Sequence, residues 1–413
     1  MKQNTYILYL ILLILTLFSC NKDNSEEWFA QNSTESLTNL NKIMYGTNNK
    51  DENATSTLKN DNTYERFKIV HISDIHLSDF TMDNKYDNPT NLKQAIAFAN
   101  LQECQINALV ASGDFINTTE KDDKQTAIKY LKSFTSTFFS FNNTVPSFLC
   151  TGNHDTNMLT DFSSNYISKQ ELHAILFEKN NYTYHQIPGE NYYYADVPDG
   201  NGNIIRFIAL DNTDQKDFTY NSLHVSCITQ KQVDWLTNIA LKENMTEKHS
   251  VIIINHHPLQ AYSKDQSTYM RTGEHLYKET LVPSIINAFI QKKNFKATYN
   301  ATQSPSGTIH VDADFKNCKG DFICYLGGHT HTQAHFEVQC DDPQASKQIM
   351  LLANTMAPDM QNNNYGYIAR DKNSTSSNSF SIYAIDTNEK KIYITYFGAK
   401  NTNTPSITSV SYR

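Results

Sequence analysis

The stretch FKIVHISDIH, residues 67–76, decides the fold, because it joins a predicted strand to a pair of polar side chains. Its first seven residues are mostly β-branched, aromatic or apolar, a composition typical of a buried strand. The strand ends at Asp74, and His76 stands two residues further on. Residues at this spacing share a face of an extended chain, so at the junction of strand and loop both side chains can turn towards one ion.

Four more hydrophobic runs end on clusters of Asp, Asn, His and Gly. The runs cover residues 108–112, 147–150, 250–254 and 322–326, and the clusters are Gly113-Asp114, Gly152-Asn153-His154-Asp155, Asn255-His256-His257-Pro258 and Gly327-Gly328-His329-Thr330-His331. Helical patterns over 89–101, 126–141, 229–241 and 281–292 alternate with these runs, and hairpins are predicted over 192–210 and 380–397. The alternation predicts an α/β fold. Ligands of such folds bind at the carboxyl ends of the strands, so we expect the five clusters to meet there.

The residue types in these clusters suit divalent metal ions. Carboxylate and imidazole ligands favour Mn, Fe, Zn, Co or Ni over calcium or a thiolate-bound metal. Asp114 follows a glycine, and its two carboxylate oxygens allow it to bridge two ions. A site with two ions activates water and holds both the attacking and the leaving oxygen of a phosphoryl transfer. Each motif alone is also typical of a turn or a structural histidine, but five in order at strand ends favour a site.

In these residues the chain resembles the calcineurin-like metallophosphoesterase superfamily, whose ordered signature is Asp-x-His, Gly-Asp, Gly-Asn-His-Asp/Glu, His and Gly-His-x-His. The resemblance runs from about Phe67 to near Gly398. It implies a four-layer α/β/β/α sandwich with a dinuclear metal site at the C-terminal edge of the strands. The implied ligands are Asp74, His76, Asp114 and His331 for one ion, and Asp114, Asn153, His256 and His329 for the other.

The resemblance also implies roles for residues beside the ligands. His154 corresponds to a histidine that binds phosphate and helps the leaving oxygen gain a proton, and Asp155 is expected to orient its imidazole. Imidazole suits this role because it exchanges protons near neutral pH. His257 either approaches the substrate or hydrogen-bonds its own loop. Arg271, between the metal loops, is either a phosphate contact or a surface charge.

Departures from related signatures narrow the expected activity. The Gly-Asp motif continues Phe115-Ile116-Asn117, without the tyrosine of purple acid phosphatases or the Asp-Arg-Gly of protein Ser/Thr phosphatases. We therefore expect an enzyme that hydrolyses phosphate mono- or diesters of a small substrate, using a hydroxide that bridges two divalent ions, Mn, Fe or Zn. One alternative is a hydrolase of lipid-linked or protein-linked phosphate or pyrophosphate. Another is a non-catalytic surface lipoprotein that binds a phosphorylated ligand.

The N-terminal segment predicts export. Lys2 precedes an uncharged run, residues 6–18, that is too short to span a bilayer and is typical of a signal peptide. The sequence Leu17-Phe18-Ser19-Cys20 resembles the bacterial lipobox. We expect a lipoprotein-type signal peptide over 1–20 and a lipid anchor on Cys20 that holds the protein in the cell envelope, periplasmic or surface-exposed. Ordinary secretion, with Cys20 merely near the cleavage site, is the alternative.

The composition of the rest of the chain predicts three parts: a tether, a domain and a C-terminal tail. Residues 21–65 are polar and predict a flexible tether, with a short helix packed on the main domain as the alternative. The domain is expected over 66–400 and a polar tail over 401–413. The 35 Lys and Arg against 43 Asp and Glu give a net charge of −8, which excludes nucleic-acid binding driven by overall charge. No protein partner is evident.

Seven cysteines occur in the chain, and Cys20 is assigned to the lipid anchor. Cys318 and Cys324 bracket a short loop and are the pair expected to form a disulfide in an exported protein. Cys150, in an apolar run, is expected to be a buried thiol.

Overall fold

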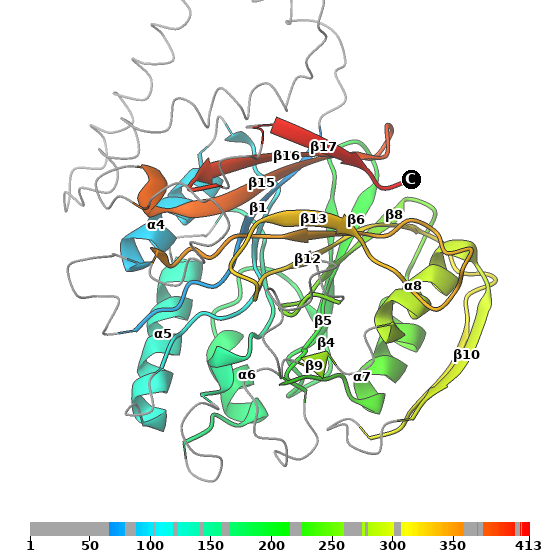
Figure 1. Cartoon of the computed structure of the whole chain (residues 1–413), viewed down its shortest axis with the longest axis horizontal. Coiled ribbons are helices and arrows are strands. Elements are labelled where there is room, and N and C mark those ends of the chain that lie inside the picture. Colours follow the sequence, from blue (N-terminus) through cyan, green and yellow to red (C-terminus); the bar gives the residue numbers. More distant parts are fainter. Residues whose placement is uncertain are drawn as a thin grey trace, which may run out of the picture.

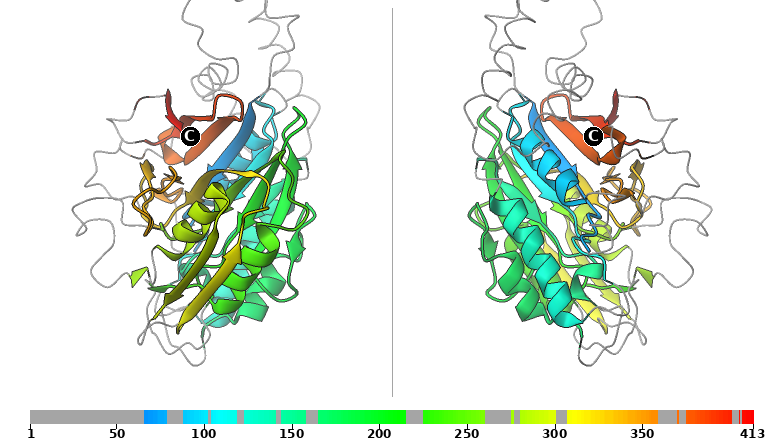
Figure 2. Two further views of the ribbon diagram at one scale, coloured as in Figure 1. Left: turned by 90° about the vertical axis from the view of Figure 1, so that its right-hand side faces the viewer. Right: turned by 90° about the vertical axis from the view of Figure 1, so that its left-hand side faces the viewer.

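Two β-sheets pack face to face between two layers of helices in the computed structural model (Figures 1 and 2). The structure describes residues 66–78, 88–101, 104–118, 123–140, 144–157, 165–214, 225–259, 275–276, 280–300, 307–358, 370, 375–400, 405 and 407–413. The predicted signal peptide with Cys20, the predicted tether over 21–65 and Arg271 lie outside these residues. Within the described ranges, none of the helices has the length and apolar character that crossing a membrane requires.

The first sheet has six strands in the order β17-β16-β15-β1-β2-β3. Their bounds are β1 Phe67–Ile72, β2 Ala108–Ala111, β3 Ser147–Leu149, β15 Ser379–Asp386, β16 Lys391–Gly398 and β17 Ile407–Ser411. Strands β1, β2 and β3 are parallel, so their carboxyl ends lie at one edge. Strands β15, β16 and β17 extend the sheet as an antiparallel meander.

The second sheet has seven strands in the order β13-β14-β12-β8-β6-β5-β4. Their bounds are β4 His185–Gln186, β5 Tyr193–Pro198, β6 Ile204–Ala209, β8 His249–Ile254, β12 Asp321–Gly327, β13 Ala334–Glu337 and β14 Ile349–Leu352. Strands β6, β8, β12 and β14 are parallel. Two small ladders join β10 (Asn294–Tyr299) with β11 (Ile309–Asp314) and β7 (Val225–Ser226) with β9 (His275–Leu276).

Helices cover the outer face of each sheet, as the two side views in Figure 2 show. The helices α4 (Asn88–Ala99), α5 (Lys124–Ser140) and α6 (Lys169–Leu176) pack on the first sheet. The second sheet is covered by α7 (Gln230–Trp235), which continues as a π-helical turn over Leu236–Ala240, and by α8 (Leu281–Gln291). A third apolar cluster lies between the sheets. The predicted four-layer α/β/β/α sandwich is therefore confirmed.

The start of α6 shows how local sequence sets a boundary. The Ser168 hydroxyl accepts a hydrogen bond from the Glu171 amide, and the Glu171 carboxylate accepts one from the Ser168 amide at 2.9 Å. This capping box satisfies two amide groups that the first turn of a helix would leave without partners. The capping box therefore fixes the residue at which α6 begins.

The structure differs from the predicted C-terminal boundary. The prediction of a polar tail over 401–413 is wrong for its second half, because Ile407–Ser411 pair with β16 as strand β17. The ring of Tyr412 beyond this strand is only 1% exposed. Thr408 and Val410 are β-branched and suit a strand whose side chains are half-buried, which is why this polar segment joins the sheet.

The predicted disulfide between Cys318 and Cys324 is wrong, because both thiols are free. Cys324 faces the cluster between the two sheets, whereas Cys318 packs against the cluster under α7 and α8. The two side chains therefore lie on opposite faces of the second sheet. Cys150 is a buried free thiol, as predicted.

Candidate metal centre

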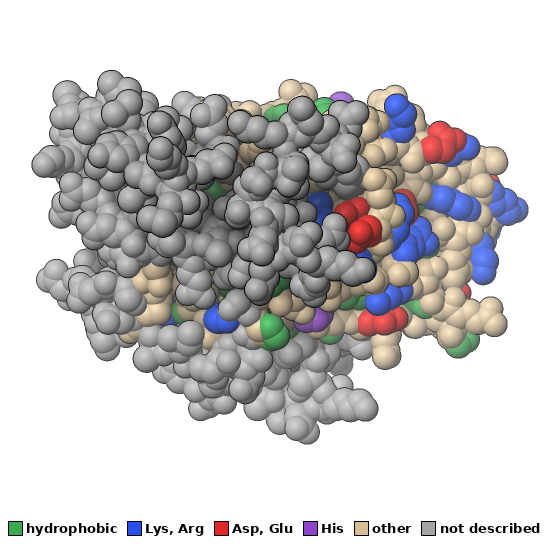
Figure 3. All heavy atoms as spheres, turned by 90° about the horizontal axis from the view of Figure 1, so that it is seen from above, with side chains coloured by type: hydrophobic (Ala, Val, Ile, Leu, Met, Phe, Trp, Pro, Cys, Tyr) green, Lys and Arg blue, Asp and Glu red, His purple; other side chains and the backbone are tan. Residues whose placement is uncertain are grey.

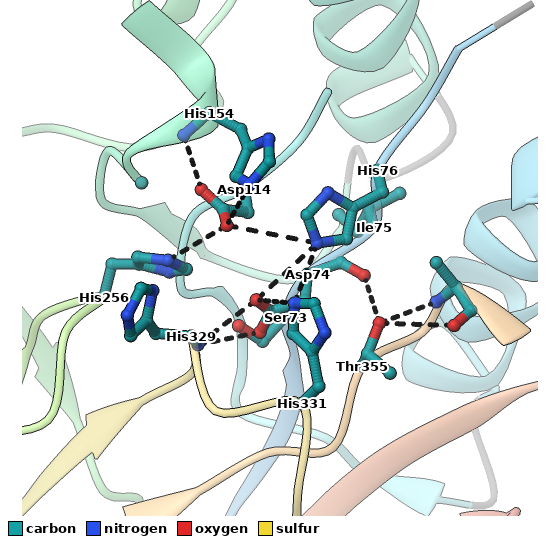
Figure 4. Close-up of polar contacts among 12 residues, drawn as sticks. Ser73, Asp74, Ile75, His76, Asp114, His154, His256, His329, His331 and Thr355 are labelled. Atoms are coloured by element: carbon teal, nitrogen blue, oxygen red, sulfur yellow. Dashed lines mark hydrogen bonds and ion pairs between the residues drawn. The ribbon is translucent and has the colours of Figure 1, made fainter. Parts of the chain in front are cut away.

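All five polar clusters lie at the carboxyl ends of parallel strands, where the two sheets meet. Asp74 follows β1, Asp114 follows β2 and Asn153 follows β3, all in the first sheet. The second sheet contributes His256 after β8 and His329 after β12. Figure 4 shows the rings of His256, His329 and His331 close to the carboxylates of Asp74 and Asp114.

The first group of candidate ligands combines residues of both sheets. Asp74, His76, Asp114 and His331 each offer one ligand atom, and these atoms lie within 4.8 Å of one another. His331 Nε2 lies 3.1 Å from His76 Nε2 and 3.3 Å from Asp74 Oδ1. His76 Nε2 lies 3.8 Å from the same carboxylate oxygen. The four ligands that the resemblance implied for one ion are thus together.

The second group forms around the amide of Asn153. Ligand atoms of Asp114, His256 and His329 lie within 4.8 Å of one another. Asn153 Oδ1 lies 3.0 Å from His256 Nε2 and 3.0 Å from His329 Nδ1. The structure therefore also brings together the four ligands implied for the other ion.

Asp114 belongs to both groups. Its Oδ2 atom lies 3.2 Å from His256 Nε2 in one group and 3.9 Å from His76 Nε2 in the other. Its Oδ1 atom accepts a hydrogen bond of 2.9 Å from the His154 amide, which fixes the plane of the carboxylate. A carboxylate held between two sets of ligands is placed to bridge two cations.

Neighbouring charges keep both carboxylates ionised. Burial alone would raise the pKa of Asp74, but the hydrogen bond and charge of His331 lower this pKa to about 2. Burial would also raise the pKa of Asp114, but His256 and His154 hold it well below its usual range. Burial lowers the pKa of His76 to about 3, so its imidazole is neutral at physiological pH. Ionised carboxylates and neutral imidazoles are the forms that bind a metal ion.

His256 shows how the fold directs a ring nitrogen into the site. Its Nδ1 lies 2.6 Å from the carbonyl oxygen of Ser112, which can only accept, so Nδ1 carries a proton. Nε2 is then the atom directed at Asn153 and Asp114. Burial alone would lower the pKa of His256, but Asp114 raises it to about 9. This strong attraction for a proton marks a position that suits a cation.

The donor set fits two divalent cations. Two ring nitrogens, those of His76 and His331, approach each other to 3.1 Å. Each presents a lone pair at Nε2 when its neutral ring carries the proton on Nδ1, and a shared cation would then satisfy both. The remaining donors are carboxylate oxygens, imidazole nitrogens and one amide oxygen, a set that suits Mn, Fe or Zn.

His154 lies beside the ligands without belonging to either group. Its Nε2 is 3.9 Å from Asp114 Oδ2, and its ring is 4.9 Å from that of His76. The side chain is 15% exposed, so an incoming molecule can touch it. Burial lowers the pKa of His154, so the neutral imidazole presents one N–H donor and one lone pair.

The structure places Asp155 differently from the prediction that it orients His154. Its carboxylate accepts hydrogen bonds from the amides of Gly152, Asp114 and Phe115 at 2.8, 3.1 and 2.7 Å. None of the hydrogen bonds that the structure describes for Asp155 joins the imidazole. Burial and the charge of Asp114 raise the pKa of Asp155 to about 8, and these amide hydrogen bonds oppose the rise. Asp155 is therefore a positioning residue that ties the Asp114 loop to the Asn153 loop.

The two predicted substrate contacts have different outcomes. His257 is 3% exposed, and its ring packs 4.3 Å from that of His329. The amide side chain of Asn255 donates to the His257 carbonyl oxygen, which secures the loop. His257 thus lies next to a candidate ligand, and its contact with substrate stays a prediction. Arg271 lies outside the described residues.

The ligand loops are held in unusual backbone conformations. Asp74, His76, Asp114, His329 and His331 all have φ between 51° and 68°. Non-glycine residues rarely adopt this left-handed region, and each such residue costs on the order of 1 kcal/mol or more. Neighbouring glycines permit the close approach of the loops, because a Cβ on Gly152 would lie 2.2 Å from the Asp114 amide nitrogen and one on Gly328 would lie 1.8 Å from Ser73 Oγ.

One contributing loop was not identified from the sequence. After β14, the Thr355 hydroxyl donates to the carbonyl oxygen of Asp74 at 2.9 Å, and the Met356 amide donates to that of Ser73 at 3.0 Å. This loop supports the first metal-binding turn from the second sheet (Figure 4). Its signal was an apolar run, residues 349–352, followed by Ala-Asn-Thr, the same pattern as the other loops but without an ionisable side chain.

Comparison with known proteins agrees with this geometry. The family model described as calcineurin-like phosphoesterase matches residues 67–333, which include all seven candidate ligands. No curated protein matches the chain.

Proposed function

The chain belongs to the calcineurin-like phosphoesterase family, and we propose that it hydrolyses phosphate mono- or diesters of small molecules at a centre of two divalent ions. The observation that carries this proposal is the position of Asp114, whose carboxylate belongs to both ligand groups. A structural metal site would need only one closed set of ligands. Two adjoining sets that share one carboxylate are the arrangement that phosphoryl transfer uses.

Different residues of the site are assigned to metal binding and to proton transfer. The two groups would hold the ions, and ions bound there supply Lewis-acid activation of water and of the phosphoryl oxygens. The imidazole of His154 faces the same space and is partly exposed. We assign it the contact with the phosphate and the proton that the leaving oxygen requires. Asp155 keeps the Asp114 carboxylate in place through the backbone amides.

The first test is hydrolysis of bis(p-nitrophenyl) phosphate and p-nitrophenyl phosphate by chelated and then metal-reloaded protein. We expect no turnover after chelation and turnover of at least one ester after reloading, because both ligand groups need their cations. Reloading in parallel with Mn, Fe and Zn identifies the ion that supports the reaction, and the ratio of the two rates separates a diesterase from a monoesterase. Stoichiometric binding of metal with no turnover of either ester, or of pyrophosphate and lipid-linked phosphates, would contradict the proposed activity.

We also propose that the enzyme is exported and held in the cell envelope by a lipid on Cys20. The support is the sequence of the first twenty residues, with its short uncharged run and lipobox-like end. We expect the full chain to fractionate with membranes and to be released by detergent but not by high salt. Replacing Cys20 by Ala should move the protein to the soluble exported fraction, while Cys150→Ala, a change at a buried thiol, should leave it with the membranes. Membrane association that survives Cys20→Ala would count against the anchor.

A further inference from the structure

A concave pocket lies at the opposite edge of the sandwich from the candidate metal centre. Its volume is about 870 Å³. It is lined by the residues that precede β8 and β12 and by the turn between β15 and β16. These segments are at the amino ends of the parallel strands, whereas the metal loops follow the carboxyl ends. Six residues of β8, at about 3.3 Å each, put the two sites roughly 20 Å apart.

The lining of this pocket is strongly basic. Its cationic side chains are Lys248, Lys292, Lys316, Lys319, Lys390 and Arg413, and its anionic side chains are Glu247 and Asp321. Four positive charges are therefore in excess, in a chain whose net charge is −8. Figure 3, the molecule seen from above, shows many Lys and Arg side chains, with Asp and Glu side chains among them, on the part that is not grey. The local charge is opposite in sign to that of the whole protein, so it is a feature of this pocket rather than of the composition.

The acidic residues of the pocket are already paired. Asp321 contacts Lys390 at 3.3 Å and also pairs with Arg413, and Glu247 contacts Lys319 at 2.7 Å. Among the described residues, Lys248, Lys292 and Lys316 have no carboxylate within ion-pair distance. Three cations of the pocket are thus available for an external anion.

Lys292 is the most constrained of the three. Its ammonium group donates to the carbonyl oxygens of Gly320 at 2.7 Å and Lys319 at 3.3 Å, and it lies 3.9 Å from the centre of the Phe289 ring. Burial, with Arg413 and Lys319 nearby, lowers the pKa of Lys292 to about 8. The fold therefore holds a half-buried cation among like charges and supplies only neutral partners for it. A multiply charged anion bound in the pocket would relieve this repulsion and give the three lysines a partner of opposite charge.

We propose that this pocket is a second, non-catalytic site that binds a polyvalent phosphate anion, either free or as the headgroup of an anionic lipid. Phosphate chemistry suits this lining, because several ammonium groups on one pocket match an anion with several charged oxygens. The inference does not depend on the metal centre or on the proposed hydrolysis. It gives the protein a binding surface on the side away from the catalytic edge.

Calorimetry at low salt, which measures the binding of tripolyphosphate to the full-length chain, tests whether the pocket binds a free anion. The measurement uses chelated Asp114→Asn protein, so that the metal centre neither holds nor cleaves the probe. We expect 1:1 binding that weakens as salt rises, and a loss of at least tenfold in affinity when Lys248 and Lys316 are both replaced by Gln. Both side chains are exposed, so the double variant is expected to fold normally. Lys292→Met, which keeps the apolar part of the side chain, should weaken binding further.

A matched control and a lipid arm complete the test. Lys129→Gln with Lys179→Gln removes two exposed charges elsewhere and should leave the affinity unchanged. Sedimentation with phosphatidylcholine vesicles, with and without phosphatidic acid, whose phosphomonoester headgroup carries up to two negative charges, tests the lipid source of the same chemistry for wild type and both double variants. Selective loss in the Lys248/Lys316 variant in either arm supports the site and identifies the source. Equal behaviour of the two double variants in both arms, or no binding in either arm, would overturn the proposal.

Discussion

Replacement of Asp114 by Asn is expected to remove metal binding and hydrolysis together. The carboxylate of Asp114 is the one group shared by both ligand sets, and it lies within 3.9 Å of ring nitrogens on either side. An amide has the same shape but no charge and only one oxygen, so it cannot bridge two cations. We expect the metal content to fall from about two ions per chain to one or none, and kcat to fall by about 10³-fold or more. Elemental analysis and the p-nitrophenyl ester assay measure the two effects.

The Asp114→Asn variant is expected to fold normally, so a loss of metal and activity would report on the carboxylate and not on unfolding. The amide oxygen of the new side chain would still accept the hydrogen bond that the His154 backbone amide now gives to Asp114 Oδ1. Circular dichroism would verify that the variant is folded. Asp312→Asn is a matched control. This carboxylate lies on β11, outside the candidate metal centre, is 72% exposed and pairs with Lys296. Retention of two ions and full activity by the Asp114 variant would refute the bridging role.

Replacement of His154 by Ala is expected to leave the metal content unchanged and to lower kcat by about 10² to 10⁴-fold. The side chain is outside both ligand groups, so the ions keep all their ligands. Its loss removes the proposed phosphate contact and proton donor. The defect should be larger for an alkyl phosphate than for p-nitrophenyl phosphate, because an alkoxide needs a proton far more than nitrophenolate does. A comparison of the two substrates, with elemental analysis of the variant, measures both claims.

The dependence on the leaving group separates a proton donor from a structural residue. His310→Ala serves as the control, because His310 is exposed on β11 and should affect neither substrate. An equal defect of the His154 variant on both substrates would be consistent with a role of His154 in binding phosphate. The same result would exclude His154 as the proton donor. A variant with full activity on both would exclude His154 from the reaction.

The sequence predicts the fold best where an apolar strand ends directly on a cluster of polar site residues. Strands β1, β2, β3, β8 and β12 are short apolar runs that end on polar clusters, and all five lie where the pattern predicts. Strand β17 was missed because its residues, ITSVS, are too polar for their pattern to predict a strand. Their extended conformation depends on pairing with β16. Helix α6 had a usable signal in Ser168 and Glu171, the capping box at its start.

The ligands of the site were predictable, but the contacts around them were not. Resemblance to an ordered signature placed seven candidate ligands that span residues 74 to 331, and the structure brings all seven together. The role of Asp155 was misjudged because it follows His154 directly. Both residues lie in a 3₁₀ turn, where successive side chains point about 120° apart, so neighbours in sequence face different partners. Such directions depend on backbone geometry that residue types alone do not reveal.

The division of the ligands between two sheets has a consequence for how the protein acquires its ions. Asp74, Asp114 and Asn153 follow strands of the first sheet, whereas His256 and His329 follow strands of the second. Neither ligand group is complete within one sheet, so no half of the chain can assemble a high-affinity site by itself. Loading with metal is therefore expected to follow the docking of the two sheets. The metal supply of the compartment in which folding finishes would then decide which ions the protein carries.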